Sequence, residues 1–306
     1  MMKDGRFRTI LLTGANGQVG YELQHSLAVP GNVVVLERSQ LDLSDANAIR
    51  RVVREIKPNL IVNPAAYTAV DKAESEPELA MAINAIAPGV LAEEAARLDI
   101  PLVHYSTDYV YDGAKSSPYV ETDSTNPLNV YGKSKLAGEN AIRAVGLPHL
   151  ILRTSWVYGT LGKNFLRTIL RSAAEREQLR VVSDQIGAPT WSRSIAEATL
   201  AALNNWNEGL SGTYHLTCAG QTSWHEFARE IVEEYEMLYE SRDWPKLRAK
   251  VASIEAIKTA EYPTPAPRPA NSRLDCIKIK HDLSVTMPDW QEALRQVLDD
   301  PGFMPT

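Results

Sequence analysis

Tyr131 of this 306-residue chain stands four residues before a lysine, Lys135. Tyr131 and Lys135 lie in the segment NVYGKSKLAGE, residues 129–139, which we predict to open a helix. Residues at i and i+4 share one face of a helix, so the lysine ammonium can lie close to the phenol. A free tyrosine has a pKa of about 10 and is a poor proton donor at neutral pH. A neighbouring positive charge is expected to lower that pKa, so the pair predicts a general acid.

Two hydroxyl residues precede this pair by about 25 positions, at the end of an apolar run. The run PLVHYST, residues 101–107, has the composition of a buried strand and ends in Ser106 and Thr107. In a doubly wound sheet, the carboxyl ends of the strands face the ligand crevice. A hydroxyl there can donate a hydrogen bond to a carbonyl oxygen and stabilise the charge that develops on it. A lone Tyr-x-x-x-Lys occurs by chance in many helices, but the two features together favour carbonyl chemistry.

Three glycines follow the first apolar run at intervals of three residues. The segment TGANGQVGYEL, residues 13–23, places Gly14, Gly17 and Gly20 between an expected strand and an expected helix. Gly14 permits a tight turn, Gly17 lets the backbone approach a pyrophosphate, and Gly20 lets the helix pack on the sheet. Free N–H groups at the helix N-terminus would bind the anion. The spacing departs from G-x-G-x-x-G and a flexible turn is the plain alternative, but the strand-turn-helix context favours a dinucleotide.

An acidic residue ends the second apolar run, about 20 residues beyond the glycines. In VVVLERS, residues 33–39, Glu37 can accept hydrogen bonds from the adenosine ribose and would favour NAD. Arg38 and Ser39 beside it can instead accommodate a 2′-phosphate, which would favour NADP. An exposed charge pair at a strand end is a third interpretation. The cofactor is therefore predicted as NADPH or NADH, without a choice between them.

Short apolar runs alternate with helical patterns up to about residue 155 and supply the elements that must position these residues. The runs are TILLT, VVVLE, LIVN, PLVHYST and HLILRT, with AMAINAIAPGVLAEEAARL among the helical segments between them. Such alternation is typical of βαβ units with a parallel sheet and helices on both faces. Right-handed crossovers then favour a doubly wound, Rossmann-type α/β fold.

The second half of the chain has a looser pattern. Helical patterns lie near residues 163–177, 192–204 and 223–240, and the Pro-rich stretch YPTPAPRPANSR occupies residues 262–273. We predict a dinucleotide-binding domain over residues 1–158 and a smaller, irregular substrate-binding domain over residues 159–306. Some segments of the second half are expected to return to the first domain.

Composition excludes several classes of protein. Hydrophobic residues make up 44% and charged residues 23%, with a net charge of −6, so a basic surface for nucleic acid or an anionic membrane is not expected. The two cysteines lack a CxxC spacing, and no histidine pair has the spacing of a zinc site. We expect no signal peptide in the first residues and no run that approaches the roughly 18 apolar residues of a membrane span. A cytoplasmic protein is predicted.

The glycine turn, the strand-end hydroxyl and Tyr-x-x-x-Lys, in this order, resemble the extended short-chain dehydrogenase/reductase family over nearly the whole chain. Longer runs resemble the dTDP-4-dehydrorhamnose reductases within that family. These runs are LLTGANGQVGYELQ, NPAAYTAVDKAE, INAIAP, YSTDYVYDG, NPLNVYGKSKLAGE, RTSWVYG, GKNF, DQIGAPT and RPANSRLD. The resemblance implies NAD(P)H-dependent reduction of the 4-keto group of dTDP-4-dehydro-L-rhamnose to dTDP-L-rhamnose, the last step of dTDP-L-rhamnose synthesis. Hydride would pass to C4 while Tyr131 protonates the oxygen.

The resemblance also implies roles for individual residues. The catalytic set is Thr107, Tyr131 and Lys135. The cofactor contacts, which include the three glycines of the turn, are Gly14, Gly17, Gln18, Val19, Gly20, Glu37, Asp42, Leu43, Ala65, Ala66, Tyr67, Tyr131 and Lys135. Contacts with the deoxysugar are Thr107, Asp108, Tyr109 and Trp156. As alternatives, Asp108 can cap the turn after its strand, and Tyr109 and Trp156 can be core aromatics.

The substrate diphosphate requires local cations on a chain with net negative charge. Arg268 and Arg273 in the stiff PAPRPANSR stretch are candidates, with Lys163 and Asn164 as weaker ones, and solvated surface arginines are the alternative. Some relatives bind a divalent metal, which makes Mg2+ possible, with Glu22 and Glu292 as possible equivalents. Scattered acids do not establish a site, so no metal ligand is predicted. A monomer or a homodimer is expected.

Two other functions remain open from the sequence. A nucleotide-sugar epimerase or dehydratase shares the same motifs but usually retains its cofactor through the catalytic cycle. A non-catalytic NAD(P)-binding regulatory subunit, like that of methionine adenosyltransferase, keeps the fold and the cofactor site alone. The intact Thr107, Tyr131 and Lys135 favour an enzyme, because a binding module needs no tuned proton donor.

Overall fold

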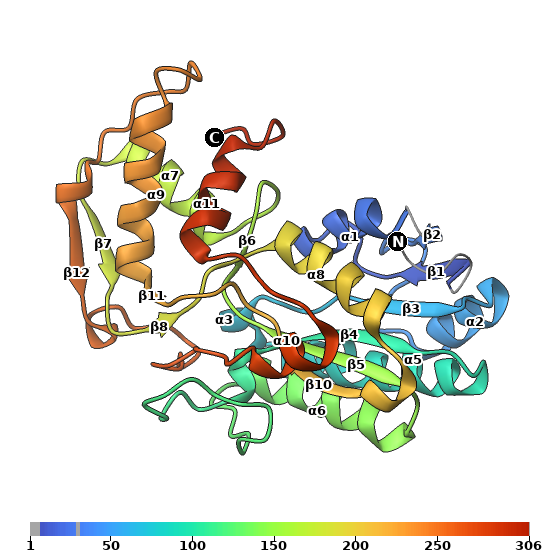
Figure 1. Ribbon diagram of the computed structural model, residues 1–306. Coiled ribbons are helices and arrows are strands. Elements are labelled where there is room, and N and C mark those ends of the chain that lie inside the picture. The colour runs from blue at the N-terminus through green and yellow to red at the C-terminus, as the bar shows by residue number, and fades with distance from the viewer. Residues whose placement is uncertain (1–6, 29–30, 306) are drawn as a thin grey trace.

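A parallel sheet forms the centre of the molecule. In the computed structural model, which describes residues 7–28 and 31–305, this sheet has six strands in the order β10-β5-β4-β3-β1-β2 (Figure 1). Every neighbouring pair in it is parallel. The strands are β1 (Thr9–Leu12), β2 (Asn32–Val35), β3 (Leu60–Asn63), β4 (Leu102–Thr107), β5 (His149–Thr154) and β10 (Gly212–His215). The predicted α/β class and doubly wound parallel sheet are confirmed.

The strands are apolar because helices cover both faces of the sheet. Alternate residues of β1 enter different cores: Ile10 and Leu12 pack on one side and Leu11 packs on the other. Helices α1 (Gln18–Ala28) and α8 (Ser192–Asn205) lie on the first side, and α2 (Ala46–Ile56), α5 (Ala87–Arg97) and α6 (Val130–Val145) on the second (Figure 1). The chain moves outward from β1 to β2 and then returns to β3 on the other side of β1, which opens a crevice between the ends of these strands.

The helix that carries Tyr131 and Lys135 has sequence signals at both ends. The Asn129 side chain accepts a hydrogen bond from the Gly132 N–H at 2.8 Å and caps the N-terminus of α6. Gly146 ends the helix with a left-handed φ of 76°. The helix therefore starts beside the carboxyl edge of the sheet, where the ligand crevice is expected.

The second half of the chain builds a smaller layer beside the sheet. Its elements are β6 (Val157–Tyr158), α7 (Phe165–Glu175), β7 (Leu179–Val182), β8 (Ile186–Gly187), β9 (Thr190–Trp191), β11 (Thr222–Ser223), α9 (Trp224–Leu238), β12 (Ile254–Ile257), α10 (Ile277–Leu283) and α11 (Trp290–Asp299). Strands β7 and β12 pair in parallel and α9 packs on them (Figure 1). Helix α8 packs on α1, and β10 extends the main sheet beyond β5.

One helical segment passes the length and composition test for a membrane span. It covers Pro77–Arg97 and contains α4 (Pro77–Met81), the π-helical turn η1 (Ala82–Ile86) and α5. The expectation that no segment is apolar enough was therefore wrong for these residues. The segment packs against α6 and α2, and 56% of its most apolar window is buried, as in a core helix of a globular protein.

Candidate active site

The glycine turn connects β1 to α1 by a close approach to the end of β3. Gly14 has a φ of 60°, and a Cβ added there would lie 2.8 Å from the Ala65 Cα. A Cβ at Gly20 would lie 2.1 Å from the Gly14 carbonyl oxygen, so only glycine lets α1 start at this distance from the strand. The nearest atom to a Cβ at Gly17 is the same oxygen at 3.2 Å. The turn thus presents bare backbone and a helix N-terminus, which fits a pyrophosphate.

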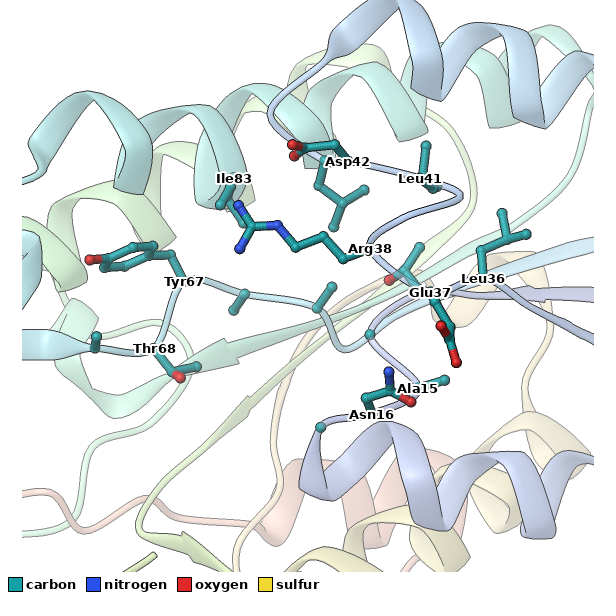
Figure 2. A pocket seen from close by; sticks show the side chains of 17 residues that line it. Ala15, Asn16, Leu36, Glu37, Arg38, Leu41, Asp42, Tyr67, Thr68 and Ile83 are labelled. Carbon is teal, nitrogen blue, oxygen red and sulfur yellow. The ribbon is translucent and has the colours of Figure 1, made fainter. Parts of the chain in front are cut away.

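Two adjoining hollows form one groove across this turn. The first has a volume of about 330 Å³ and is the pocket drawn in Figure 2. The second has a volume of about 690 Å³ and extends to the carboxyl ends of β4 and β5. Both are lined by Gly14, Asn16, Gly17, Ala65, Ala66 and Thr68. A ligand with two separated ring systems, such as a dinucleotide, fits a groove of this form.

Every residue in the set of cofactor contacts implied by the resemblance lines this groove. The first hollow contains Glu37, Asp42, Leu43 and Tyr67. The second contains Gln18, Val19, Gly20, Tyr131 and Lys135. The predicted sugar contacts Thr107, Asp108, Tyr109 and Trp156 also line the second hollow, whereas Arg268 lines neither.

Opposite charges line the first hollow. Figure 2 shows the Arg38 guanidinium reaching across the pocket, while the Glu37 carboxylate points toward Ala15. Asp42 accepts hydrogen bonds from the backbone and side chain of Ser44, which lower the pKa of its carboxyl. Ser39 is not among the lining residues. At this end of the groove, Arg38 is therefore available to a 2′-phosphate and Glu37 to a free ribose hydroxyl.

The catalytic end differs from the sequence-based expectation in the contacts of Lys135. Its Nζ donates to the Tyr105 carbonyl oxygen at 2.6 Å and lies 3.3 Å from the His104 Nε2. Burial raises the pKa of Tyr131 to about 12, and a hydrogen bond with Thr107 opposes that rise. Burial also lowers the pKa of Lys135 to about 8. The expectation that Lys135 lowers the pKa of Tyr131 was wrong for the free protein, because desolvation of the phenolate is the larger effect.

Thr107 organises the turn that follows β4. Its hydroxyl donates to Asp108 Oδ1 at 3.0 Å and accepts from the Tyr109 N–H at 3.2 Å. Thr107 is therefore the residue that caps the 3-10 turn Asp108–Val110. The Asp108 carboxyl is buried, and burial raises its pKa to about 6. The Tyr109 and Tyr131 rings meet edge to face with their centroids 5.4 Å apart, so the four residues form one compact group.

Trp156 is held in an unusual backbone conformation at the wall of the groove. Its φ is 49°, and its ring stacks on Trp224 with 3.5 Å between centroids. A Cβ at Gly187 would lie 2.6 Å from the Trp156 ring, which explains the glycine of the DQIGAPT run. Trp224 also lines the groove but was missed from the sequence, because nothing in its local pattern links residue 224 to a site near residue 131.

The candidate diphosphate ligands occupy different positions. The Arg268 guanidinium lies 5.9 Å from the centre of the Tyr109 ring, and its Nη2 bonds Asp71 at 2.8 Å. Its Nη1 is buried and has no hydrogen-bond partner in the described part of the chain. Lys163 lines the second hollow, whereas Asn164 caps α7 and donates to Gln18 Oε1 at 2.9 Å. Arg273 lies outside the groove and bonds Asn271, Gln221 and the Ser116 carbonyl.

The two possible metal ligands belong to different helices, α1 and α11. Glu22 accepts a hydrogen bond from Arg193 at 3.0 Å, and Glu292 lies at the start of α11. Among residues 7–28 and 31–305, no group of three or more histidine, cysteine, aspartate or glutamate side chains is arranged to hold a metal ion.

Comparisons with known proteins agree over almost the whole chain. The family described as RmlD substrate binding domain matches residues 8–302. The dTDP-4-dehydrorhamnose reductase of Burkholderia thailandensis is 50% identical over 291 residues, covering 93% of this chain and 96% of that one. The crystal structure of a dTDP-4-dehydrorhamnose reductase from Clostridium acetobutylicum has a TM-score of 0.87 and 37% identity, with coverages of 95% and 98%.

A further solved structure is relevant to the groove. The dTDP-4-dehydrorhamnose reductase of Bacillus anthracis, in complex with NADP, has a TM-score of 0.85 and 34% identity. It covers 96% of this chain and 99% of that one. The resemblance inferred from the motifs is confirmed. With a family match that spans nearly every described residue, the chain belongs to the RmlD substrate binding domain family.

Proposed function

We propose that this protein is a dTDP-4-dehydrorhamnose reductase, which reduces the 4-keto group of dTDP-4-dehydro-L-rhamnose to dTDP-L-rhamnose with NADPH or NADH. The observation that carries the proposal is the single groove that joins the glycine turn to Thr107 and Tyr131. Relatives of that name share up to 50% identity with this chain in the comparisons above. A pure binding subunit would need the glycine turn but not the acid group at its far end.

The residues at the far end of the groove supply a proton and a rigid frame. When bound, the reduced nicotinamide supplies the hydride. Tyr131 donates its hydroxyl proton to the oxygen at C4, and the raised pKa keeps that proton in place at neutral pH. The Thr107 hydroxyl donates to Asp108 in the free protein, and on substrate binding it would turn to donate to the same oxygen while it still accepts from the Tyr109 N–H. Lys135 holds the cofactor ribose beneath Tyr131 and its positive charge favours the phenolate that remains after proton transfer.

The sugar and its diphosphate lie between the two halves of the chain in this proposal. Trp156 and Tyr109 provide apolar faces for the deoxysugar, and Asp108 provides a carboxyl for its hydroxyl groups. Arg268, whose guanidinium lies against the Tyr109 ring beside the second hollow, would offer its unpartnered Nη1 to the diphosphate, and Lys163, which lines that hollow, would add a second cation. We propose a division into residues 1–158 and 159–306, with the substrate between the two parts; the return of β10 and α8 to the first part supports this arrangement.

Both reduced cofactors are proposed to bind. Arg38 would pair with a 2′-phosphate and Glu37 with a free ribose, and both side chains are exposed at the rim of the first hollow. We further propose a cytoplasmic location, which accords with two free cysteines, Cys218 and Cys276. A monomer or homodimer is proposed and can be identified by light scattering.

The decisive experiment follows the absorbance of NADPH and NADH separately, with dTDP-4-dehydro-L-rhamnose generated in place. Oxidation that depends on the sugar nucleotide and forms dTDP-L-rhamnose is the expected result. No oxidation of either cofactor would remove this function, and purified protein that retains NAD without net consumption would favour an epimerase or dehydratase. EDTA added to the same assay tests the Mg2+ dependence that the family resemblance allows.

A further inference from the structure

A row of buried polar side chains crosses three strands beneath the groove and ends at Lys135. We call Thr13, Asn63, His104 and Lys135 the polar row. The exposed fractions of these residues are 2%, 1%, 0% and 2%, respectively. Asn63 at the end of β3 is the register partner of His104 in β4, and Thr13 follows β1 beside them. Thr13, Asn63 and His104 therefore lie on the same face of the sheet, where α6 inserts Lys135.

Consecutive members of the row lie at hydrogen-bond distance. Thr13 Oγ1 lies 2.5 Å from Asn63 Oδ1, and Asn63 Nδ2 lies 3.1 Å from His104 Nδ1. His104 Nε2 lies 3.3 Å from Lys135 Nζ. Buried polar groups cost free energy unless they are paired, so a continuous row of this kind is maintained only if each partner is in place. None of Thr13, Asn63 and His104 has a part in the reaction proposed above.

The row determines where the lysine nitrogen lies. A lysine ammonium has three N–H donors. Among the residues that the structure describes, Nζ has the Tyr105 carbonyl and the His104 ring within bonding distance, at 2.6 and 3.3 Å. The third donor is left for the groove, which Lys135 lines. Without the His104 ring, the long side chain would have one anchor instead of two and could turn away from the cofactor.

The direction of the hydrogen bonds depends on the charge of Lys135. A neutral imidazole has one N–H and one acceptor nitrogen. In the arrangement described above, Thr13 donates to Asn63 and Asn63 donates to His104 Nδ1, so the ring proton is on Nε2 and faces Lys135. A neutral amine can accept that proton in a hydrogen bond, but an ammonium cannot.

The opposite direction suits the charged lysine. The two ends of the Asn63 amide have nearly the same shape, so the group can turn over in place. Its oxygen then accepts from the His104 Nδ1–H, and its nitrogen donates to Thr13. The His104 Nε2 becomes an acceptor for the Lys135 ammonium. Each charge state of Lys135 therefore fits one direction of the hydrogen bonds along the polar row: the neutral amine fits the first direction and the ammonium fits the second.

Other charged and titratable groups surround this end of the row. Glu139 is one helical turn beyond Lys135 on α6 and raises the pKa of the lysine, but Arg153 from β5 neutralises it through a bidentate pair. Tyr131 lies on the same helix, and Asp108 lies beyond the end of β4. Burial lowers the pKa of His104 well below its ordinary value, so its ring stays neutral when Lys135 titrates.

We propose that His104 is a positioning residue for Lys135, and that the direction of hydrogen bonds along the polar row sets whether this lysine is charged. The proposal rests on the proposed function only in assigning Lys135 to the cofactor. It adds a role for three buried residues that do not touch the substrate.

The test measures NADPH binding to the full chain by fluorescence titration between about pH 6 and pH 10, without turnover. In the wild type, binding should weaken as Lys135 loses its charge near pH 8, and Lys135→Met should abolish that pH step. Asn63→Asp places an acceptor-only group beside Nδ1, which keeps the ring proton there and favours the ammonium. The step should then move to higher pH by about one unit.

Two substitutions of His104 test the positioning itself. His104→Leu should weaken NADPH binding at neutral pH about tenfold, because one anchor of Nζ is lost. His104→Gln retains an amide oxygen as an acceptor and should recover most of that loss. Circular dichroism and thermal melting establish that each variant is folded, and if His104→Leu is unfolded, His104→Gln and Asn63→Asp decide the question.

An unchanged pH step in folded Asn63→Asp, or wild-type binding by His104→Leu, would overturn the proposal. The proposed function can fail separately. A wild-type protein that binds NADPH with the expected step but reduces no sugar nucleotide would reject the reductase and keep the role of His104. If the wild type reduces the sugar nucleotide but the pH step of NADPH binding is the same in Asn63→Asp, the reductase function stands and the role of the polar row is rejected.

Discussion

Tyr131 holds its proton firmly in the free protein, and this affects how the site can act. Burial raises the pKa of the phenol to about 12, while the nearby Lys135 is engaged with Tyr105 and His104. The acid is thus fully protonated at neutral pH and ready to donate. Proton transfer becomes favourable only as negative charge develops on the substrate oxygen, where Thr107 and Lys135 can stabilise the products.

Replacement of the phenol should separate catalysis from binding. We expect Tyr131→Phe to lower kcat by about a thousandfold, because the proton donor is lost while the aromatic ring still fills its place. The dissociation constant of NADPH should change less than about threefold, since the glycine turn and the first hollow are intact. Steady-state assays and fluorescence titration provide the two measurements. Turnover equal to that of the wild type would contradict the assignment of Tyr131 as the acid.

The buried lysine should make stability depend on pH in the free protein. Burial lowers the pKa of Lys135 from 10.5 to about 8. Below about pH 8 both states carry the charge, and burial penalises the folded one. Between about pH 8 and pH 10.5, Lys135 keeps its proton in the unfolded chain but has released it in the folded chain. The free energy of unfolding therefore rises with pH over this range. At 1.36 kcal/mol per pKa unit, the rise is about 3 kcal/mol.

The measurement compares denaturant unfolding of the wild type and Lys135→Met across this range. The difference between them isolates the lysine from other titrating groups. We expect the wild type to gain stability relative to Lys135→Met as the pH increases from about 8 to 10.5. Parallel stability curves for the two proteins would show that the amine is not desolvated as described.

At the scale of elements, α6 must lie very close to the π-helical turn to place its catalytic residues. Asn84 in that turn accepts from the Tyr67 N–H at 2.7 Å and donates to the Ser134 hydroxyl at 3.0 Å. Gly138 faces the same turn, and a Cβ there would lie 2.1 Å from the Asn84 carbonyl oxygen. The π-helical turn therefore joins the loop after β3, where Tyr67 lines the first hollow, to the helix that carries Tyr131.

Gly138→Ala should push α6 away from this turn. We expect it to lower the free energy of unfolding by about 3 kcal/mol through overpacking against backbone, and to raise the KM for NADPH as Lys135 shifts. Gly89→Ala is the matched control on the facing helix, where a Cβ would meet only the Ala141 methyl at 3.1 Å. Its steric cost should be offset by the higher helix propensity of alanine. Denaturant unfolding checks both, and equal losses would contradict the close contact at Gly138.

Local sequence pattern predicted much of this arrangement but not all of it. Strands buried on both faces are continuously apolar, and helix α6 has a capping Asn129 and a terminal Gly146, so these elements were recognisable. The π turn was not, because it depends on bonds from Asn84 to residues 17 and 50 positions away. The partners of Lys135 were missed for the same reason: the sheet register brings Asn63 and His104 together.

At the scale of the molecule, one hydrophobic core extends through both halves of the chain. It includes Leu12 and Val103 of the sheet together with Ile195 of α8, Phe227 of α9 and Leu294 of α11. Strand β10 also covers the edge of β5. The two proposed domains therefore share a core, and neither is expected to be stable without the other.

A fragment of residues 1–158 tests this dependence. Without β10 and α8, the edge of β5 and one face of the sheet would be exposed to water. We expect the fragment to aggregate or to lack a cooperative thermal transition, whereas the full chain unfolds in one transition. Circular dichroism melting and size-exclusion chromatography make the comparison. A soluble fragment with a sharp transition would show that the first half is an independent domain.

Arg268 connects the Pro-rich stretch to the first half of the chain and tests how the two halves share the substrate. Its Nη2 is paired with Asp71, its guanidinium lies against Tyr109, and its buried Nη1 has no partner in the described residues. We expect Arg268→Glu to raise the KM for the nucleotide sugar about tenfold and leave the KM for NADPH nearly unchanged, because a diphosphate loses a charged donor.

Arg273→Glu is the control, since this arginine lies in the same stretch but is bonded outside the groove. It should change either KM less than about twofold, as expected for a partly exposed charge. Equal increases in both KM values for Arg268→Glu would indicate a general loss of structure. Equal effects of the two arginine substitutions on the sugar nucleotide would instead point to the charge of the whole stretch. Only a selective effect at Arg268 supports a diphosphate site formed jointly by the two halves of the chain.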